Sequence, residues 1–236
     1  MSRALANLAW PEAADVPTGT LLAVPVGATE QHGPHLPLGT DTEIAVSLAS
    51  GLSRLRPEVV VAPCVSYGSS GEHARFAGTL SIGQEATELL LVELCRSATL
   101  TFGRVLLIST HGGNAGPVAR ALIRLRQEGR DVRAVLPRWP HDAHAGRAET
   151  ALMLAIAPEH VRLDRAEAGA TAPLRELLPR LVSGGVREVS ANGILGDPAG
   201  ASAHEGRVML DAAVESLAGL VAAWDSPPRD SPPQDS

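Results

Sequence analysis

The stretch EQHGPHLPLGTD, residues 30–41, gathers side chains that can bind a metal ion or carry a proton. Glu30 and His32 are two residues apart, so in an extended segment both side chains point to the same side of the backbone. Asp41 lies at the other end, where a helical pattern of apolar residues begins. Imidazole and carboxylate groups together suit zinc, iron or manganese, and the lack of a nearby cysteine argues against a closed structural zinc site. The stretch therefore predicts a divalent-metal site.

Simpler interpretations of the same residues stay open at this point. Asp41 could act only as the N-cap of the helix that it begins. His35 could equally be a loop residue that forms a hydrogen bond and binds no metal. Pro34 and Pro37 restrict the loop backbone, which reduces the entropy that its side chains lose when they bind.

Two further stretches carry the same kinds of group. In THGGN, His111 follows an apolar run and precedes Gly112 and Gly113, which let the backbone turn sharply beside a ligand. The alternative is a phosphate-binding turn at a helix start, although no P-loop lysine follows. In HAGRAET, Glu149 lies five residues after His144. An acidic residue in the first turn of a helix is common without any ligand, so this pair alone decides little.

Strands and helices alternate along the chain in a way that positions these groups. Four short apolar runs indicate buried strands, at 20–26, 58–63, 104–110 and 131–137. Apolar residues at helical spacing indicate helices at 41–55, 84–102, 116–129, 149–158, 171–185 and 201–224. This alternation predicts an α/β fold, a three-layer α/β/α sandwich with a mostly parallel central sheet.

The polar stretches all follow predicted strands. In an open parallel sheet, ligands bind outside the carboxyl ends of the strands. Six of the eight histidines lie in the four segments that follow the strands. One of these segments is rich in glycine and serine and holds Glu72 and His73, which could also be ordinary surface polarity. We expect these groups to meet at one edge of the sheet.

Composition excludes several classes of function. The formal net charge is -6, which disfavours non-specific binding to nucleic acid. No apolar run reaches the length of a membrane-spanning helix, and the N-terminus lacks a signal-peptide pattern, so we expect a soluble cytoplasmic protein. Cys64 and Cys95 form no metal or redox motif, so we expect both to be free, buried thiols in a reducing compartment.

The chain length suits one large domain with a short extension. We expect residues 1–224 to form a single domain, because the strand and helix pattern runs through them without a break. Residues 225–236, DSPPRDSPPQDS, repeat one motif and carry no apolar side chain beyond proline, which predicts a disordered tail.

Four ordered blocks of the sequence resemble the creatininase family. They are GATEQHGPHLPLGTDTEIA, GEHARFAGTLSIG, STHGGNAG and HAGRAETALML, and the resemblance spans roughly residues 20 to 215. It implies a three-layer α/β fold, hydrolysis of an amide bond and a site for two divalent metal ions, zinc, iron or manganese, in each subunit. It also implies a closed homo-oligomer, usually a hexamer.

The resemblance assigns roles to the polar residues. Glu30 and His111 would hold one metal, His32 and Glu149 the other, and Asp41 would bridge the two. His144 matches the histidine that donates a proton to the leaving group.

One position departs from the family pattern. Family members that open creatinine carry a glutamate at the position of Gly113, where it is thought to help deliver water. The creatinine-binding tryptophans of the family are also not evident, although Trp139 lies in the corresponding loop. We therefore expect creatinine to be a poor substrate for this chain. Glu72 or His73 could serve as the base instead, or the metal-activated water could need none.

Three stretches resemble a narrower branch of the family, the peptidases that mature a ribosomally made precursor peptide. They are VRLDRAEAGATAPLRELLPRL, NGILGDPAGAS and HAGRAET. The substrate implied is a modified precursor peptide whose C-terminal Val-Tyr pair is oxidatively decarboxylated and cross-linked, and the enzyme would release that pair. The alternatives are an amidohydrolase that acts on a small cyclic amide or formamide, and a non-catalytic metal-binding protein.

Overall fold

The structure is a computed structural model that describes residues 3–140 and 143–225. Its centre is a five-stranded sheet in the order β1-β3-β2-β4-β5, and every neighbouring pair is parallel. The strands are β1 Arg3–Ala4, β2 Leu21–Val26, β3 Val60–Val61, β4 Arg104–Ser109 and β5 Val132–Val135. The predicted parallel sheet is confirmed.

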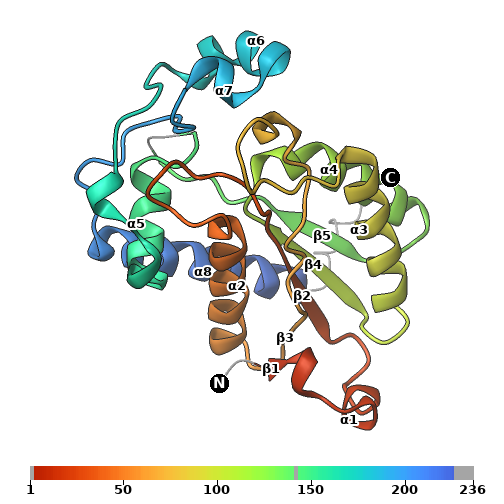
Figure 1. Ribbon diagram of the computed structural model, residues 1–236. Coiled ribbons are helices and arrows are strands. Elements are labelled where there is room, and N and C mark those ends of the chain that lie inside the picture. The colour runs from red at the N-terminus through yellow and green to blue at the C-terminus, as the bar shows by residue number, and fades with distance from the viewer. Residues whose placement is uncertain (1–2, 141–142, 226–236) are drawn as a thin grey trace, which may run out of the picture.

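Helices cover both faces of this sheet (Figure 1). The longer helices are α2 Thr40–Leu55, α3 Gln84–Ala98, α4 Ala115–Gln127, α5 Arg147–Ile156, α6 Leu174–Gly184 and α8 Ala203–Asp225. Two shorter helices are α1 Trp10–Ala14 and α7 Val186–Val189, and the turns Gly71–His73 and Gly112–Asn114 are 3-10 helices. Helices α2, α5 and α8 lie on one face, and α3 and α4 lie on the other (Figure 1). The predicted three-layer α/β/α class is confirmed.

The sheet is buried on both faces because its strands alternate their side chains between two cores. In β2, Leu21 and Ala23 belong to the core under α2, α5 and α8. Leu22 and Val24 belong to the core under α3 and α4. This two-sided burial explains why the strands read as continuous apolar runs in the sequence.

Several boundaries differ from the sequence-based expectations. The strand expected at 58–63 pairs only over Val60–Val61, and the helix expected at 84–102 ends at Ala98. Both α1 and the two-residue β1 were not predicted, because segments this short carry no readable periodicity. Helix α6 forms despite an internal proline, Pro179.

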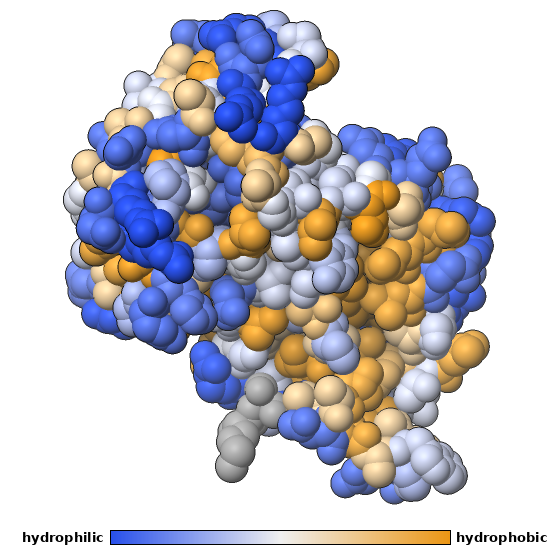
Figure 2. All heavy atoms as spheres, in the orientation of Figure 1, coloured by the Kyte–Doolittle hydropathy of each residue, from blue (hydrophilic) through white to orange (hydrophobic). Residues whose placement is uncertain are grey.

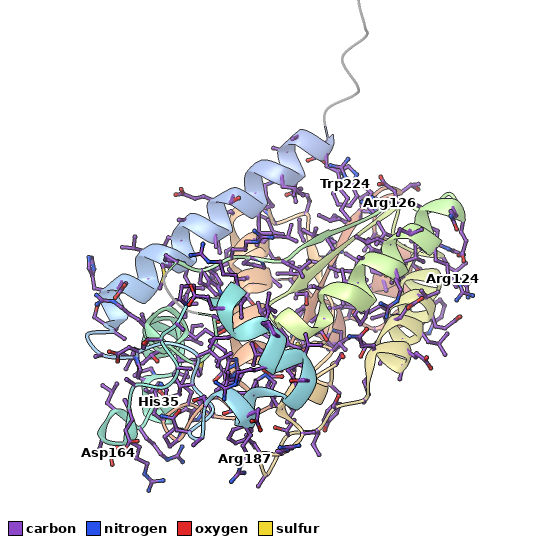
Figure 3. The ribbon with its side chains drawn as sticks, turned by 90° about the horizontal axis from the view of Figure 1, so that it is seen from above. His35, Arg124, Arg126, Asp164, Arg187 and Trp224 are labelled. Atoms are coloured by element: carbon purple, nitrogen blue, oxygen red, sulfur yellow. The ribbon has the colours of Figure 1, made fainter. Side chains whose placement is uncertain are left out.

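The end of α8 is attached to the amino-terminal edge of the sheet, where the strands begin. The indole Nε1 of Trp224 (Figure 3) donates to the carboxylate of Asp131 at 2.9 Å. The carboxylate of Asp225 accepts hydrogen bonds from Arg56 and Arg104. The predicted tail was expected to start at residue 225, but Asp225 is the last residue of the helix. The remainder of that tail lies outside the described residues.

No helix within residues 3–140 and 143–225 is long and apolar enough to cross a membrane. Both cysteines are free thiols. Cys95 is buried as expected, whereas Cys64 is only partly buried.

Candidate metal centre

Polar side chains from four separate segments converge at the carboxyl edge of the sheet. Glu30 and His32 come from the segment after β2, and His111 directly follows β4. Asp41 lies in the first turn of α2, and Glu149 in the first turn of α5. Except for Glu149, which is partly exposed, these side chains are almost completely buried.

Hydrogen bonds between the loops hold this arrangement. The buried side chain of Asn114 accepts from the backbone N–H of Ser69 at 2.9 Å and donates to the carbonyl of Gly27 at 3.0 Å. The hydroxyl of Thr110 donates to the carbonyl of Asp41 at 2.7 Å. The loops after β2, β3 and β4 are therefore bonded to one another beside the site.

The five predicted metal ligands lie at distances that suit shared cations. His111 Nδ1 is 3.2 Å from Glu30 Oε1 and 3.5 Å from Asp41 Oδ2. His32 Nε2 is 3.6 Å from Asp41 Oδ1 and 3.8 Å from Glu149 Oε2. Two ligands bound at 2.0–2.1 Å to one tetrahedral ion are about 3.3 Å apart. The two oxygens of Asp41 face different histidines, as a carboxylate that bridges two ions requires.

Several of these atoms are buried without a hydrogen-bond partner. They are both carboxylate oxygens of Glu30, Oδ2 of Asp41 and Nε2 of His32. A buried polar atom left unpaired is costly, and a buried carboxylate even more so. A cation would satisfy all four atoms, so the residues present fit a divalent metal. Among the described residues, three groups bring three donor atoms within 4.8 Å of one another: Glu30 with Asp41 and His111, His32 with His144 and Glu149, and Glu30 with His73 and His144.

The second ring nitrogen of three histidines is bound to a backbone carbonyl. His32 Nδ1 lies 3.2 Å from the carbonyl of Glu30, and His111 Nε2 lies 2.8 Å from that of Ser69. His144 Nε2 lies 2.9 Å from the carbonyl of Gln31. A carbonyl accepts only from N–H, so each ring in its neutral form has its other nitrogen free as a lone pair that faces the site. Metal-binding histidines typically have this arrangement.

Gln31, which the sequence analysis did not single out, gives His73 the opposite arrangement. Its Oε1 accepts from the N–H of Gly33 at 2.9 Å, and its Nε2 donates to the carbonyl of Gly193 at 2.9 Å, which fixes the amide orientation. The same Nε2 lies 2.8 Å from His73 Nδ1, which must therefore accept. His73 then carries its proton on Nε2, 3.3 Å from Glu30 Oε1. His73 has no lone pair left for a metal or for water.

Burial and charge separate the pKa values of these groups. Burial alone would lower the pKa of His32 and of His111, but the facing carboxylates outweigh it and raise them to about 9 and about 10. Burial lowers the pKa of His73 to about 4. The pKa of His144 lies well below its usual value, because the ring is buried and because His32 and His73 lie close to it. Burial raises the pKa of Glu149 to about 7.

Glu72 occupies the space that a side chain at position 113 would need. Its Oε1 lies 3.7 Å from His111 Nε2, and burial raises the pKa of its carboxyl group. A Cβ added at Gly113 would lie 2.1 Å from the carbonyl oxygen of Ser69 and 2.5 Å from Oε1 of Glu72. Only glycine fits at 113, and the neighbouring carboxylate comes from a different loop.

The structure decides some of the alternatives that the sequence left open. Asp41 is not the N-cap of α2: the cap position is Gly39, and both Asp41 oxygens face histidines. His35 (Figure 3) belongs to none of the three donor groups, and its Nε2 lies 2.8 Å from the Thr150 hydroxyl. The side chain of His111, which begins the turn, faces the buried carboxylates of Glu30 and Asp41, and these would repel a phosphate.

The strained backbone beside His144 also serves the site. Ala145 has a φ of 53°, and it is the one non-glycine residue with positive φ in the described part of the chain. Its N–H donates to Oε2 of Glu149 at 2.6 Å, which orients that carboxylate.

Metal uptake by the metal-free protein should release protons. His32 and His111 are both protonated near neutral pH, because their pKa values are about 9 and about 10. Each must lose a proton before it can bind a metal, and Glu149, with a pKa of about 7, is partly protonated there as well, so we expect release of about two to three protons per chain near neutral pH. Release should decline as the pH rises through about 9 and 10. Calorimetric titration with Mn²⁺ in buffers of different ionisation enthalpy measures the number, and heats that do not depend on the buffer would contradict it.

The same shifts give the metal-free protein a pH-dependent stability. A raised histidine pKa stabilises the fold below the unfolded value of about 6.5, and this contribution is lost as the pH rises through the folded value. We therefore expect the Tm of the metal-free protein to fall from about pH 7 to about pH 10, and bound metal to reduce that fall.

Comparison with known proteins identifies the family. The family model described as creatinine amidohydrolase matches residues 6–221, which is most of the chain. The chain belongs to the creatininase family. It is accordingly a hydrolase of that family, and its clusters of histidine and carboxylate side chains are consistent with divalent-metal binding.

Two groups of relatives are informative. The chain is 49% identical over 210 residues to the mycofactocin precursor peptide peptidase of Mycolicibacterium smegmatis, covering 86% of this chain and 85% of the relative. It is 46% identical over 217 residues to the peptidase of the same name from Mycobacterium tuberculosis, covering 88% and 86%. The creatinine amidohydrolase of Pseudomonas putida is 28% identical over 253 residues, covering 91% and 94%.

Solved structures agree with the fold. A creatinine amidohydrolase superposes with a TM-score of 0.79 at 25% identity, over 96% of this chain and 99% of that chain. A creatininase described with Mn superposes with a TM-score of 0.78 at 26% identity, over 96% and 100%.

Proposed function

We propose that this protein is a metal-dependent peptidase that removes the modified C-terminal Val-Tyr pair from the mycofactocin precursor peptide. The observation that carries the proposal is the 46–49% identity, over most of both chains, to mycofactocin precursor peptide peptidases. The chain is much less similar to creatinine amidohydrolase, at 28% identity.

The proposed cofactor is a pair of divalent cations, zinc, iron or manganese. Glu30 and His111 would hold one ion, His32 and Glu149 the other, and Asp41 would bridge them. Such ions polarise an amide carbonyl and lower the pKa of bound water. Support comes from the ligand spacing and from the unpaired buried atoms at the site.

The chain's own residues would then handle the protons. Glu72 is the better candidate to accept the proton of the attacking water, because its carboxylate borders the cavity and its Oε1 lies 3.7 Å from His111 Nε2. His73 is the weaker candidate, since both of its ring nitrogens are engaged. The amine must leave with a proton, and His144 has the free ring nitrogen to deliver it. His144 is neutral at rest, so the proton that it gives to the amine would be the one that Glu72 takes from the attacking water and passes on.

The size of the cavity favours a peptide over a small cyclic amide. The cavity beside the centre has a volume of about 820 Å³ and is bordered by Glu72, His73, His111 and His144. Ligand pockets of about 300–1,000 Å³ hold drug-sized molecules, so this one has room for more than a creatinine-sized ring.

Mass spectrometry of a cleavage reaction tests the function. The metal-loaded protein is incubated with the modified precursor peptide, and we expect loss of the C-terminal pair. If the folded, metal-loaded protein leaves the peptide intact but hydrolyses small cyclic amides or formamides, it is an amidohydrolase of the family that acts on small substrates. A non-catalytic metal-binding role would require that neither class of substrate is turned over.

Substitution of Glu72 and His73 should have unequal effects. We expect Glu72→Gln to lower kcat by about 100-fold or more, because the amide cannot accept the proton of water. We expect His73→Asn to lower kcat less than tenfold, because both ring nitrogens of His73 are already engaged. Loss of a general base usually lowers kcat by about 100-fold or more. Steady-state rates with the precursor peptide measure both. Equal losses, or a larger loss for His73→Asn, would reverse the assignment.

We also propose that the chain assembles into a homo-oligomer, a hexamer by family resemblance. Apolar side chains gather on the face that carries α3 and the segment before it (Figure 2). They include Leu80, Leu89 and Leu90, which are exposed. Exposed apolar patches commonly mark interfaces. Light scattering tests this, and a monomeric mass would contradict it.

A further inference from the structure

Helix α6 has one broad apolar side, and only part of it is packed against the protein. Leu177 and Leu181 pack with Val186 and Leu195 in a small separate core. The rest of this apolar side carries a stripe of residues spaced by four, namely Leu174, Leu178 and Val182. These three side chains are 46%, 46% and 84% exposed. We call Leu174, Leu178 and Val182 the α6 stripe.

Helix α6 stands away from the main layers of the fold. It packs chiefly on α7 and on the turn Gly71–His73. Figure 1 shows α6 and α7 together at one end of the molecule, apart from the helices that flank the sheet. The packing of the fold therefore does not explain why this exposed face is apolar.

The α6 stripe borders the same cavity as the candidate catalytic residues. All three stripe residues line the cavity of about 820 Å³ that also contacts Glu72, His73, His111 and His144. One wall of this cavity is thus polar and ionisable, whereas the part that α6 contributes is apolar. A molecule whose scissile bond lies against the polar wall would place its neighbouring side chains against α6.

We propose that the α6 stripe is a substrate-recognition wall that binds apolar side chains of a peptide next to its scissile bond. The proposal rests on the proposed function in taking a peptide as the occupant. The continuity of the stripe with the catalytic wall favours this occupant over a second copy of the chain, which would close the cavity to substrate. Covering apolar side chains in this way removes them from water and contributes to binding.

Binding measurements on matched variants test the wall. Leu178→Gln and Val182→Gln are combined in one variant, because glutamine keeps a good helix propensity while removing the apolar surface. Val208→Gln is the control, since Val208 is 56% exposed on α8 and is not among the residues that line the cavity. Circular dichroism checks that α6 still folds.

Two fluorescein-labelled peptides serve as probes, one ending in Val-Tyr and the other ending in Ser-Asn. Fluorescence anisotropy should show that the wild type and Val208→Gln prefer the apolar peptide. We expect the α6 variant to bind that peptide about tenfold or more weakly, the equivalent of one or two buried methylene groups or more. Its affinity for the polar peptide should change little, so the preference is lost.

Turnover of the precursor peptide gives a second measurement. The α6 variant should raise KM while kcat at saturating peptide stays near the wild-type value, because the stripe holds substrate and takes no part in proton transfer. A fall in kcat with unchanged KM would overturn the proposal.

Other outcomes also decide the matter. The proposal would be contradicted if the wild type bound both peptides with equal affinity. It would also be contradicted if the α6 variant lost the same factor of affinity for both peptides. A smaller oligomeric mass for the variant with unchanged peptide binding would assign the stripe to a subunit interface. If the wild type binds with apolar preference but cleaves no peptide, the wall stands and the proposed peptidase function fails.

Discussion

Replacing Asp41 with asparagine should remove both metal and activity. The substitution keeps the size of the side chain but takes away the charge that faces His32 and His111. A bridging carboxylate serves two ions at once, so we expect metal content to fall by half or more. We expect kcat/KM to drop by about a thousand-fold or more, since the bound metals would supply several kcal/mol to the transition state. Plasma mass spectrometry and cleavage rates measure the two effects.

A matched substitution distinguishes this loss from a general effect. Asp164 (Figure 3) is exposed and lies outside the site, so Asp164→Asn should keep full metal content and activity. Full metal occupancy together with near-normal turnover in Asp41→Asn would show that Asp41 bridges nothing.

The second large effect is expected from His144→Ala. Without a group to protonate the amine, kcat should fall by about 10²–10⁴-fold. Metal content should stay close to the wild-type value if His144 carries a proton and holds no ion. Added imidazole should restore part of the activity by entering the space left by the ring. Rates with and without imidazole, together with metal analysis, measure these effects.

The exposed histidine on α8 provides the control, because His204→Ala makes the same change away from the site. A loss of metal in His144→Ala would instead make His144 a ligand alongside His32 and Glu149, whose donor atoms lie close to its own. That result would leave the proton donor to be sought elsewhere.

The convergence of the predicted site residues follows from sequence because it depends on topology. Alternating strands and helices place every strand-to-helix loop at one edge, so Glu30, His111 and Glu149 had to meet there once the sheet was parallel. The carboxyl ends of β2 and β4 are adjacent in the sheet, and Val26 pairs with Ser109. The same argument predicted that Glu72 and His73 lie at this edge, and the structure places them beside His111 and Glu30.

The hydrogen-bond partners behind these residues could not be predicted in this way. Gln31 lies between two predicted ligands, yet its side chain contacts Gly193, which is 162 residues away in sequence. Such a contact depends on tertiary packing and leaves no periodic signal in the chain. The need for glycine at 113 is similar, because the obstacle is the carbonyl of Ser69 in another loop.

The attachment of Asp225 to Arg56 and Arg104 has a practical consequence for handling the protein. Arg104 begins β4, so the helix ends at the opposite side of the sheet from the candidate metal centre. An affinity handle or a sensor-chip linkage joined beyond Asp225 would therefore start from the side away from the catalytic cavity. Immobilised in this orientation, the molecules would present their reactive openings to the flowing solution.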